Sequence, residues 1–205
     1  MKSQRPSSAD AALAGLLQKN IRESIAVKQA LLESPQLLSG LVTAARRMAE
    51  ALRSGGKIIF FGNGGSASDS LHLAGELVGR FGPTPRPGLP ALALPANAAS
   101  VTAIGNDFGY DAIFSRQIEA FGRPGDVAVG ISTSGRSKNV LKGIAQAKKQ
   151  GLFTVGWTGQ TGGELRTLAD LCLCVPSSDT QRIQEAHILM GHALCELIEE
   201  ELQRA

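Results

Sequence analysis

The sequence predicts a three-layer α/β/α sandwich built on a five-stranded parallel sheet and preceded by two helices. Three observations lead to this fold. Five short apolar runs after Gly56 carry little charge and little alternation, as strands buried on both faces do. The stretches between these runs are long enough for crossover helices. At 205 residues the chain has the size of one large domain, so we expect a single core.

Two helices are expected before the first strand. Within residues 13–32 the apolar side chains recur at every fourth position, with charged residues between them, as in an amphipathic helix: Leu13, Leu17, Ile21 and Ile25. The second helix starts after the N-cap Ser34, has Pro35 in its first turn and stops at Gly55. Because a terminal apolar stripe needs a cover, we expect both helices to pack against partner subunits.

The remaining elements follow the apolar runs. Strands are expected at residues 58–61, 91–94, 127–131, 152–157 and 171–175, and a last helix at residues 181–203. The proline-rich stretch 83–90 is expected to be a loop within the domain. We therefore divide the chain into a flexible N-terminus, residues 1–10, and one domain, residues 11–205, that includes the helical pair 11–54.

Composition excludes several classes of protein. The formal net charge is only +3, 19% of the residues are charged and nine are aromatic, so neither a nucleic-acid partner nor a membrane partner is expected. Three cysteines form no obvious disulfide framework, and Cys172 and Cys174 occupy alternate positions on one face of a predicted strand. The chain shows no signal peptide and no run of 18 apolar residues, so we expect a cytoplasmic protein.

A glycine-rich turn at residues 61–68 follows the first strand and opens a helix. Such a turn directs backbone N–H groups and the positive end of the helix dipole at one point, which suits a phosphate. A dinucleotide site is disfavoured because the second strand ends at Leu94 and Pro95 without an acidic residue for a ribose, and a Walker loop would need a Lys. A tight turn without a ligand is the alternative.

A second turn, residues 131–139, again connects a strand to a helix. It holds more hydroxyl groups than one helix cap requires, at Ser132, Thr133, Ser134 and Ser137. Because both turns follow parallel strands, they lie at the same edge of the sheet. Two anion-binding turns at one edge favour a phosphorylated small molecule as the ligand.

Histidines and carboxylates suggest further chemistry. His72 and Glu76 lie four residues apart on one helix face, which indicates a surface hydrogen bond or a pair of ligands above the substrate. On the last helix Gln184 and His192 are about 12 Å apart along the axis, so they meet one ion only if both lean over the intervening turn. His187 lies about 140° around that helix from His192, so we expect a packed histidine with a hydrogen-bonded ring.

Taken together, these segments resemble the phosphoheptose isomerase branch of the sugar isomerase (SIS) family. The matching stretches are residues 62–81, 103–140 and 182–199, in the family's order and spacing. The resemblance implies a flavodoxin-like fold and an aldose-ketose isomerase that converts sedoheptulose 7-phosphate to D-glycero-D-manno-heptose 7-phosphate through an enediol. It also implies a homotetramer with active sites between subunits.

The resemblance assigns roles to individual positions. It implies a zinc ion bound by His72, Glu76, Gln184 and His192, with Glu76 and His192 also acting as the acid/base pair. It implies substrate contacts at Asn63, Gly64, Gly65, Glu76, Asn106, Asp107, Ser132, Thr133, Ser134, Ser137 and Gln184. Gly75 and Gln181 depart from the family pattern, because some members have acidic residues there.

A non-catalytic function on the same scaffold is the alternative, since sites are grafted on folds. Relatives of this kind sense sugar phosphates or associate with the replication initiator. The initiator-associating relatives lack the His/Glu pair and the histidine on the last helix, and this chain keeps all three. The retained residues favour the enzyme.

Overall fold

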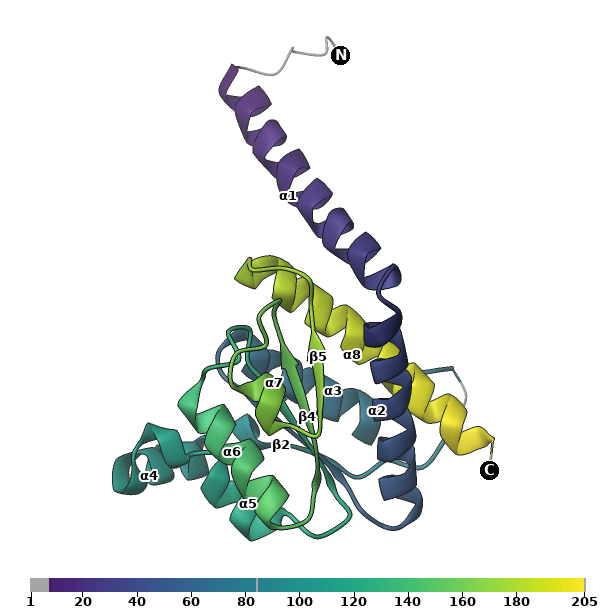
Figure 1. Ribbon diagram of the computed structural model, residues 1–205, viewed down its shortest axis with the longest axis vertical. Coiled ribbons are helices and arrows are strands. Elements are labelled where there is room, and N and C mark those ends of the chain that lie inside the picture. The colour runs from purple at the N-terminus through teal and green to yellow at the C-terminus, as the bar shows by residue number, and fades with distance from the viewer. Residues whose placement is uncertain (1–7, 84, 205) are drawn as a thin grey trace.

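A five-stranded parallel sheet forms the centre of the protein (Figure 1). The computed structural model describes residues 8–83 and 85–204. The strands lie in the order β2-β1-β3-β4-β5, which is the flavodoxin-like order with its switch point between β1 and β3. Their bounds are β1 Ile58–Gly62, β2 Ala91–Ala93, β3 Val127–Ile131, β4 Phe153–Thr158 and β5 Leu171–Cys174. The predicted sheet is confirmed, with strand ends shifted by one residue.

Helices connect the strands and surround the sheet. They are α1 Ser8–Leu32, α2 Pro35–Arg53, α3 Gly65–Val78, α4 Ala98–Phe108, α5 Ser115–Phe121, α6 Lys138–Lys149, α7 Leu165–Leu168 and α8 Thr180–Gln203, with short 3₁₀ turns η1 Leu94–Ala96 and η2 Tyr110–Ala112. Residues 8–10, expected to be flexible, belong to α1, where Asp10 suits the positive end of the helix dipole. Residues 1–7 of that range lie outside the described residues.

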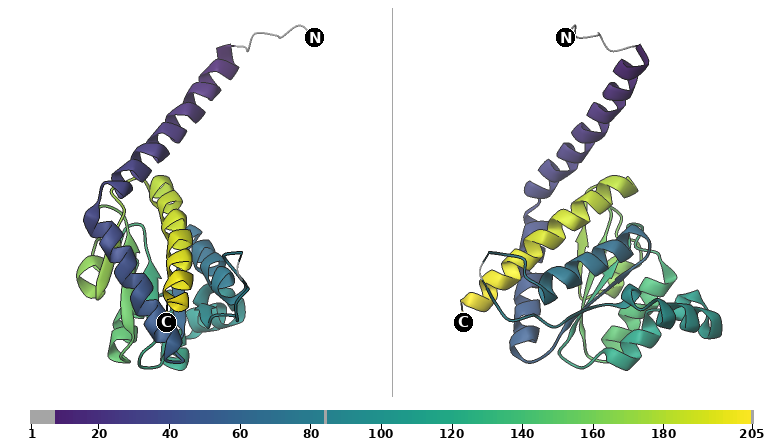
Figure 2. Two further views of the ribbon diagram at one scale, coloured as in Figure 1. Left: turned by 90° about the vertical axis from the view of Figure 1, so that its right-hand side faces the viewer. Right: turned by 180° about the vertical axis from the view of Figure 1, so that it is seen from behind.

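Helices cover both faces of the sheet (Figure 2), and one apolar cluster lies on each side of it. On one face α2, α3 and α8 pack against side chains such as Phe60 and Trp157. On the other face α5, α6 and α7 pack against side chains such as Phe61. There the Phe61 ring contacts that of Phe114, with a centroid distance of 5.3 Å. The three central strands β1, β3 and β4 therefore bury both of their faces, which explains their nearly uniform apolar sequences.

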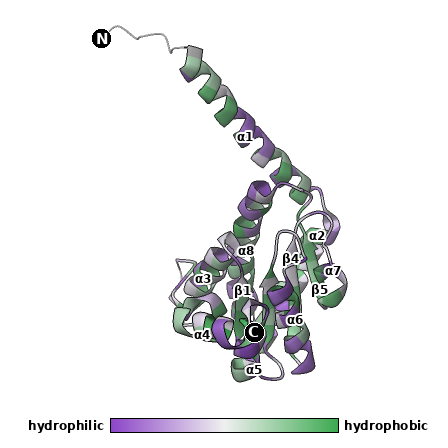
Figure 3. Ribbon diagram, turned by 90° about the vertical axis from the view of Figure 1, so that its left-hand side faces the viewer, coloured by the Kyte–Doolittle hydropathy of each residue, from purple (hydrophilic) through white to green (hydrophobic). Residues whose placement is uncertain are grey.

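The two N-terminal helices differ in their surroundings. The helix α2 packs on the sheet and α8 of its own chain and buries Leu41 and Met48 there. One face of α2 is thus covered within the chain, and the packing of α2 against a partner subunit stays a prediction. By contrast, α1 projects from the body, with apolar and polar residues along its length (Figures 1 and 3). Its predicted stripe is exposed, with Leu17 at 61% and Ile25 at 60% exposure.

No helix in the described part of the chain is both long enough and apolar enough to cross a bilayer.

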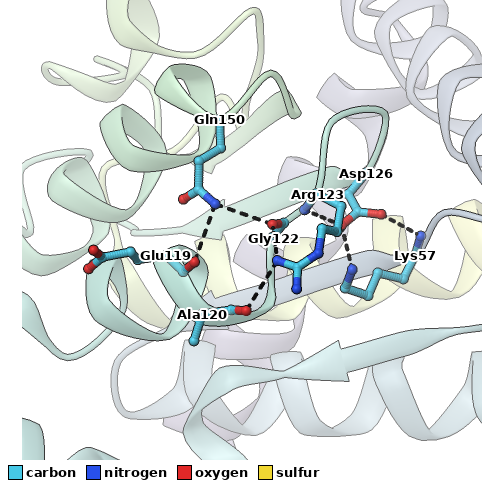
Figure 4. Close-up of polar contacts among 7 residues, drawn as sticks. All are labelled: Lys57, Glu119, Ala120, Gly122, Arg123, Asp126 and Gln150. Carbon is cyan, nitrogen blue, oxygen red and sulfur yellow. Dashed lines mark hydrogen bonds and ion pairs between the residues drawn. The ribbon is translucent and has the colours of Figure 1, made fainter.

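Asp126 secures the edge of the sheet opposite the two predicted ligand turns (Figure 4). Its buried carboxylate accepts hydrogen bonds from the backbone N–H of Lys57, at 2.9 Å, and of Arg123, at 2.8 Å. The Lys57 ammonium forms an ion pair with the same carboxylate at 2.5 Å. The Asp126 side chain thus connects the start of β1 to the turn before β3, because it accepts hydrogen bonds from backbone N–H groups that the strands leave unpaired.

Replacing Asp126 by Ala is expected to lower the free energy of unfolding by about 3 kcal/mol, because two backbone donors and a partly buried ammonium lose their acceptor. Urea denaturation measures this change. Glu119→Ala is the matched control, since Glu119 forms only an exposed pair with Arg116 and its loss should cost less than about 1 kcal/mol. Equal effects of the two substitutions would contradict the structural role of Asp126.

Candidate active site

The helices α3 and α8 run side by side and in the same direction, although over a hundred residues separate them in the sequence. Near the start of α3, Gly65 and Gln184 of α8 are in such close contact that a Cβ atom added to Gly65 would lie 2.5 Å from Gln184 Nε2. Further along, Gly191 leaves room for Leu73, and beyond the end of α3 Gly82 lies against Glu199. This pairing brings the predicted residues of the first βα unit and of the last helix onto one surface.

A cluster of His72, Glu76 and His192 lies between these helices. The Nε2 atoms of His72 and His192 are 2.8 Å apart, and His72 Nε2 is 3.4 Å from Glu76 Oε1. One ligand atom from each of the three residues lies within 4.8 Å of the other two. The predicted pair of His72 and Glu76 therefore meets His192 across the helix interface.

The donor set of this cluster fits a zinc ion. Zinc binds imidazole nitrogens and carboxylate oxygens, and three protein ligands leave a position open for substrate. Two ring nitrogens that face each other this closely also need a shared proton or a cation between them. His72, Glu76 and His192 can thus hold a metal ion, and the arrangement supplies a carboxylate and an imidazole at the same point.

Two loop segments, residues 79–83 and 85–90, lie on one side of the cluster. The Phe81 ring lies against the His192 ring, with a centroid distance of 5.5 Å. Glu199 holds both segments, because its carboxylate accepts hydrogen bonds from the N–H groups of Phe81 and Gly82 and pairs with Arg86 at 2.6 Å. Arg86 in turn donates to the main-chain oxygen of Glu76 at 3.0 Å. The two segments therefore fix both His192 and the turn that carries Glu76.

The Glu199 carboxylate is charged in this setting. Burial alone would raise the pKa of Glu199, but the hydrogen bond and the charge of Arg86, together with the two N–H groups, hold it below its ordinary value.

Asp69 lies one turn before His72 on α3. Burial raises the pKa of Asp69 to about 6, and the charge of His72 opposes this shift. Its Oδ2 atom is buried without a hydrogen-bond partner among the described residues. A carboxyl group with these properties can accept a hydrogen bond or a proton from a ligand at the cluster.

Asp69→Asn is expected to stabilise the metal-free protein at pH 8. Because the pKa of Asp69 is about 6 in the folded protein and near 3.8 in the unfolded chain, the folded protein binds this proton more tightly. The resulting stabilisation is complete below pH 3.8 and is lost as the pH rises through about 6. The substitution removes the penalised charge, so the gain, about 1 kcal/mol after discounting for solvent exposure, should vanish at pH 4. Thermal unfolding at the two pH values measures it. A gain that does not depend on pH would contradict this account.

The glycine-rich turn adopts the predicted conformation between β1 and α3. Gly64 has φ +56° and ψ −121°, a backbone conformation that side chains other than glycine rarely adopt. The Asn63 side chain points across the sheet edge and forms two hydrogen bonds of 2.9 Å with the Asn139 amide. The Tyr110 hydroxyl also donates to Asn63 Oδ1 at 2.9 Å. These contacts join the turn after β1 to the helix after β3, and the N–H groups of Ser66 and Ala67 at the start of α3 donate to the carbonyls of Asn63 and Gly64.

The hydroxyl-rich turn lies after β3, as expected. Ser132 and Ser137 lie 3.0 Å apart at their Oγ atoms, and the Ser134 hydroxyl accepts from the Arg136 N–H at 3.2 Å. A pocket of about 200 Å³ adjoins this turn, lined by Thr133, Ser134, Arg136, Gly159, Gln160, Thr161, Ser177, Ser178, Thr180 and Ile183. Hydroxyl groups and one guanidinium make it suitable for an anion.

Other predicted residues lie further from the cluster. Gln184 contacts the Gly65 end of α3, about two turns before His72, so its role as a metal ligand stays a prediction. Asn106 and Asp107 bond each other at the exposed end of α4 and make no hydrogen bond to either turn among the described residues. His187 is buried, its Nε2 lies 3.3 Å from the Thr158 carbonyl, and burial lowers its pKa to about 4. The prediction of a packed His187 is confirmed.

Sequence reasoning missed several residues of this surface. Asp69 could have been found, because it lies three residues before His72 on the same helix face. Arg136 stands inside the hydroxyl-rich turn and adds a guanidinium that lines the pocket. Phe81, Arg86 and Glu199 left no such signal, since their contacts with one another and with His192 depend on the packing of α8.

Comparison with known proteins agrees with this geometry. The family model of the SIS domain matches residues 23–159. A phosphoheptose isomerase of Aneurinibacillus thermoaerophilus is 48% identical over 188 residues, which cover 92% of this chain and 94% of the relative. One from Aquifex aeolicus is 50% identical and covers 90% of this chain and 95% of the relative.

A solved structure gives the same result. The phosphoheptose isomerase of Neisseria gonorrhoeae superposes with a TM-score of 0.86 at 41% identity, covering 92% of this chain and 99% of that one. The chain has the parallel sheet described above, and the SIS model matches most of it, so the protein belongs to the SIS domain family. Within that family the chain belongs to the phosphoheptose isomerases.

Proposed function

We propose that the protein interconverts sedoheptulose 7-phosphate and D-glycero-D-manno-heptose 7-phosphate. The observation that carries this proposal is the His72, Glu76 and His192 cluster, which supplies proton-transfer groups on the surface that also holds the two anion-binding turns. Moving a carbonyl between C1 and C2 requires a base at the carbon and an acid/base at the oxygens. Membership of the phosphoheptose isomerases supports the same substrate.

Glu76 is the base that takes the proton from one carbon and returns it to the next. A carboxylate suits this role because its two oxygens reach adjacent carbons, and the Arg86 hydrogen bond to the Glu76 carbonyl holds its helix turn. His192 serves the oxygens, since an imidazole gives and takes protons near neutral pH. The Phe81 ring against His192 limits the motion of that imidazole.

The proposed cofactor is zinc, held by His72, Glu76 and His192, with Gln184 as a further ligand. When bound, a zinc ion would polarise the carbonyl and the enediol oxygens of the substrate. The two histidines and the carboxylate are the residues of this chain that orient such an ion, and the same residues keep their acid/base groups beside the carbon chain.

The phosphate would lie at the sheet edge, against Ser132, Thr133, Ser134 and Ser137, with Asn63, Gly64 and Gly65 beside the sugar. Ile183, which lines the pocket, lies nine positions before His192 on α8, a rise of about 14 Å. A triose phosphate is too short to span this distance, and a longer sugar phosphate spans more of it. The spacing is therefore consistent with a long-chain sugar phosphate as the substrate.

Incubation of the purified protein with sedoheptulose 7-phosphate tests the function. We expect the aldose to form, as detected by NMR, with exchange of one carbon-bound proton for solvent deuterium. Binding of the ketose phosphate without turnover, in protein loaded with zinc, would instead identify a sugar-phosphate sensor.

We also propose a homotetramer with active sites between subunits, in a reducing cytoplasm that keeps the three free cysteines as thiols. The exposed apolar stripe of α1 supports assembly, because such a surface needs a cover. Asn106 and Asp107 stand on the exposed end of α4, from which they can contact the substrate of a neighbouring subunit.

Replacing Leu17 and Ile21 together by Glu is expected to dissociate the tetramer, because two charges enter an apolar interface. Light scattering at micromolar concentration measures the mass. Lys19→Gln, between the two positions, is the control and should leave the mass unchanged. A wild-type protein that is a stable monomer under these conditions would contradict the assembly.

A further inference from the structure

Two thiols lie side by side on the edge strand β5, away from the proposed active site. Cys172 and Cys174 project from the same face of this strand, and their Sγ atoms are 3.8 Å apart. Both are half-buried and free of disulfides. β5 pairs only with β4, so its outer edge is open within the described chain.

A hollow of about 400 Å³ lies beside this pair. Its walls come from Arg166 on α7 and from the first turn of α2, at Gln36 and Leu37. The thiols are therefore accessible to a small ion and its water ligands. Cys195, the third thiol of the chain, is buried in the apolar core between α2, α3 and α8 and does not reach the hollow.

The electrostatics of the pair favour one thiolate. The hydrogen bond from the Cys172 thiol lowers the pKa of Cys174 to about 7, and the charge of Arg166 acts in the same direction against the effect of burial. The same hydrogen bond and burial raise the pKa of Cys172. A thiolate and a neighbouring thiol thus share one proton near neutral pH.

The distance between the sulfur atoms matches a chelate. With metal–sulfur bonds of about 2.3 Å, a separation of 3.8 Å corresponds to an S–metal–S angle of about 110°, close to the tetrahedral value. Soft thiolate ligands select thiophilic cations over Mg²⁺ or Ca²⁺. A linear two-coordinate ion would need the sulfurs further apart than they are.

We propose that Cys172 and Cys174 form a second metal site, a two-thiolate chelate for a divalent cation of the Zn²⁺ or Cd²⁺ type. Binding forms two metal–sulfur bonds and releases to solvent the proton of Cys172 and any proton still on Cys174. Water or a small external thiol completes the coordination from the hollow.

An internal disulfide fits this geometry less well. Residues two apart in an extended strand have Cα atoms about 6.6 Å apart, at the upper limit of the range for disulfides. Their side chains also stand parallel, whereas a disulfide needs Cβ atoms about 3.8 Å apart. Chelation requires no movement of β5, which its pairing with β4 holds in place.

Titration of the metal-free protein with Cd²⁺ tests the site, because cadmium–thiolate bonds give an ultraviolet charge-transfer band that histidine and carboxylate ligands do not. We expect one band-forming Cd²⁺ per chain, with its affinity lowered about tenfold or more in Cys172→Ser and in Cys174→Ser. Cys195→Ser is the matched control and should bind as the wild type does. The absence of the band in the wild type, or its persistence in the double Cys172→Ser, Cys174→Ser variant, would overturn the proposal.

Alkylation of the wild-type protein gives a second test that needs no variant. Bound Cd²⁺ should slow the labelling of Cys172 and Cys174 at least about tenfold, as located by mass spectrometry, because both sulfurs are then ligated. Unchanged labelling of these two thiols at saturating Cd²⁺ would also overturn the site. Neither measurement depends on isomerase activity, so the proposed function and this site can fail separately.

Discussion

Glu76→Gln is expected to lower kcat by about a thousandfold or more, while the variant still binds sedoheptulose 7-phosphate. The amide keeps an oxygen ligand for a metal and nearly the same shape, but it cannot accept the proton from carbon. If Glu76 served only to bind metal, excess zinc would restore turnover. We therefore expect the variant to stay inactive at saturating zinc, with solvent-deuterium exchange at the substrate carbon reduced to the same extent.

The controls for this prediction come from α8. Glu196→Gln changes an exposed carboxylate on that helix and should leave kcat unchanged. His192→Gln should behave like Glu76→Gln, because the imidazole is the second member of the pair. Deuterium exchange at the wild-type rate in metal-replete Glu76→Gln would refute the assignment of Glu76 as the base.

Removing the hydroxyls of Ser134 and Ser137 together is expected to raise KM about a hundredfold, with a much smaller change in kcat. Each hydroxyl would donate to a charged phosphate, and such a bond contributes about 1.5 kcal/mol or more. Both side chains are accessible, whereas Ser132 is buried and its loss would also disturb packing. Steady-state kinetics of the double alanine variant measures the effect.

Two further measurements make this prediction specific. Ser39→Ala removes an exposed hydroxyl of α2, which bonds only the Gln36 carbonyl, and should not change KM. Sedoheptulose without the phosphate should bind equally weakly to the wild type and to the double variant. An unaltered KM for the phosphorylated ketose would indicate that the phosphate binds in another part of the site.

The sheet and the positions of the turns after β1 and β3 could be predicted because their signals are local. A buried strand needs an apolar run, and the residues that end it, such as Gly64, occupy positions with a special backbone conformation. The boundary of α1 was placed too late, since Ser8 and Asp10 are ordinary first-turn residues that polarity alone does not distinguish from a free terminus.

The site could be predicted only in part. His72 and Glu76 lie four residues apart on one helix face, so their spacing indicates that their side chains lie together. The family resemblance implied His192 as their partner. The Phe81, Arg86 and Glu199 contacts could not be predicted, because they depend on where α8 lies relative to a loop more than a hundred residues earlier. The sequence also could not predict that α2 packs on its own chain while the apolar stripe of α1 is exposed. Both helices are amphipathic, and only tertiary packing decides which face is covered.

The parallel contact between α3 and α8 has a consequence for the folding of the chain. All five strands and both turns precede α8 in the sequence, so the sheet can form before the last helix docks. Such an intermediate would hold His72 beside Glu76 but would lack His192, and the face of α3 that receives α8 would be open to solvent. On the proposed mechanism, the acid/base pair is therefore complete only when the last helix has docked.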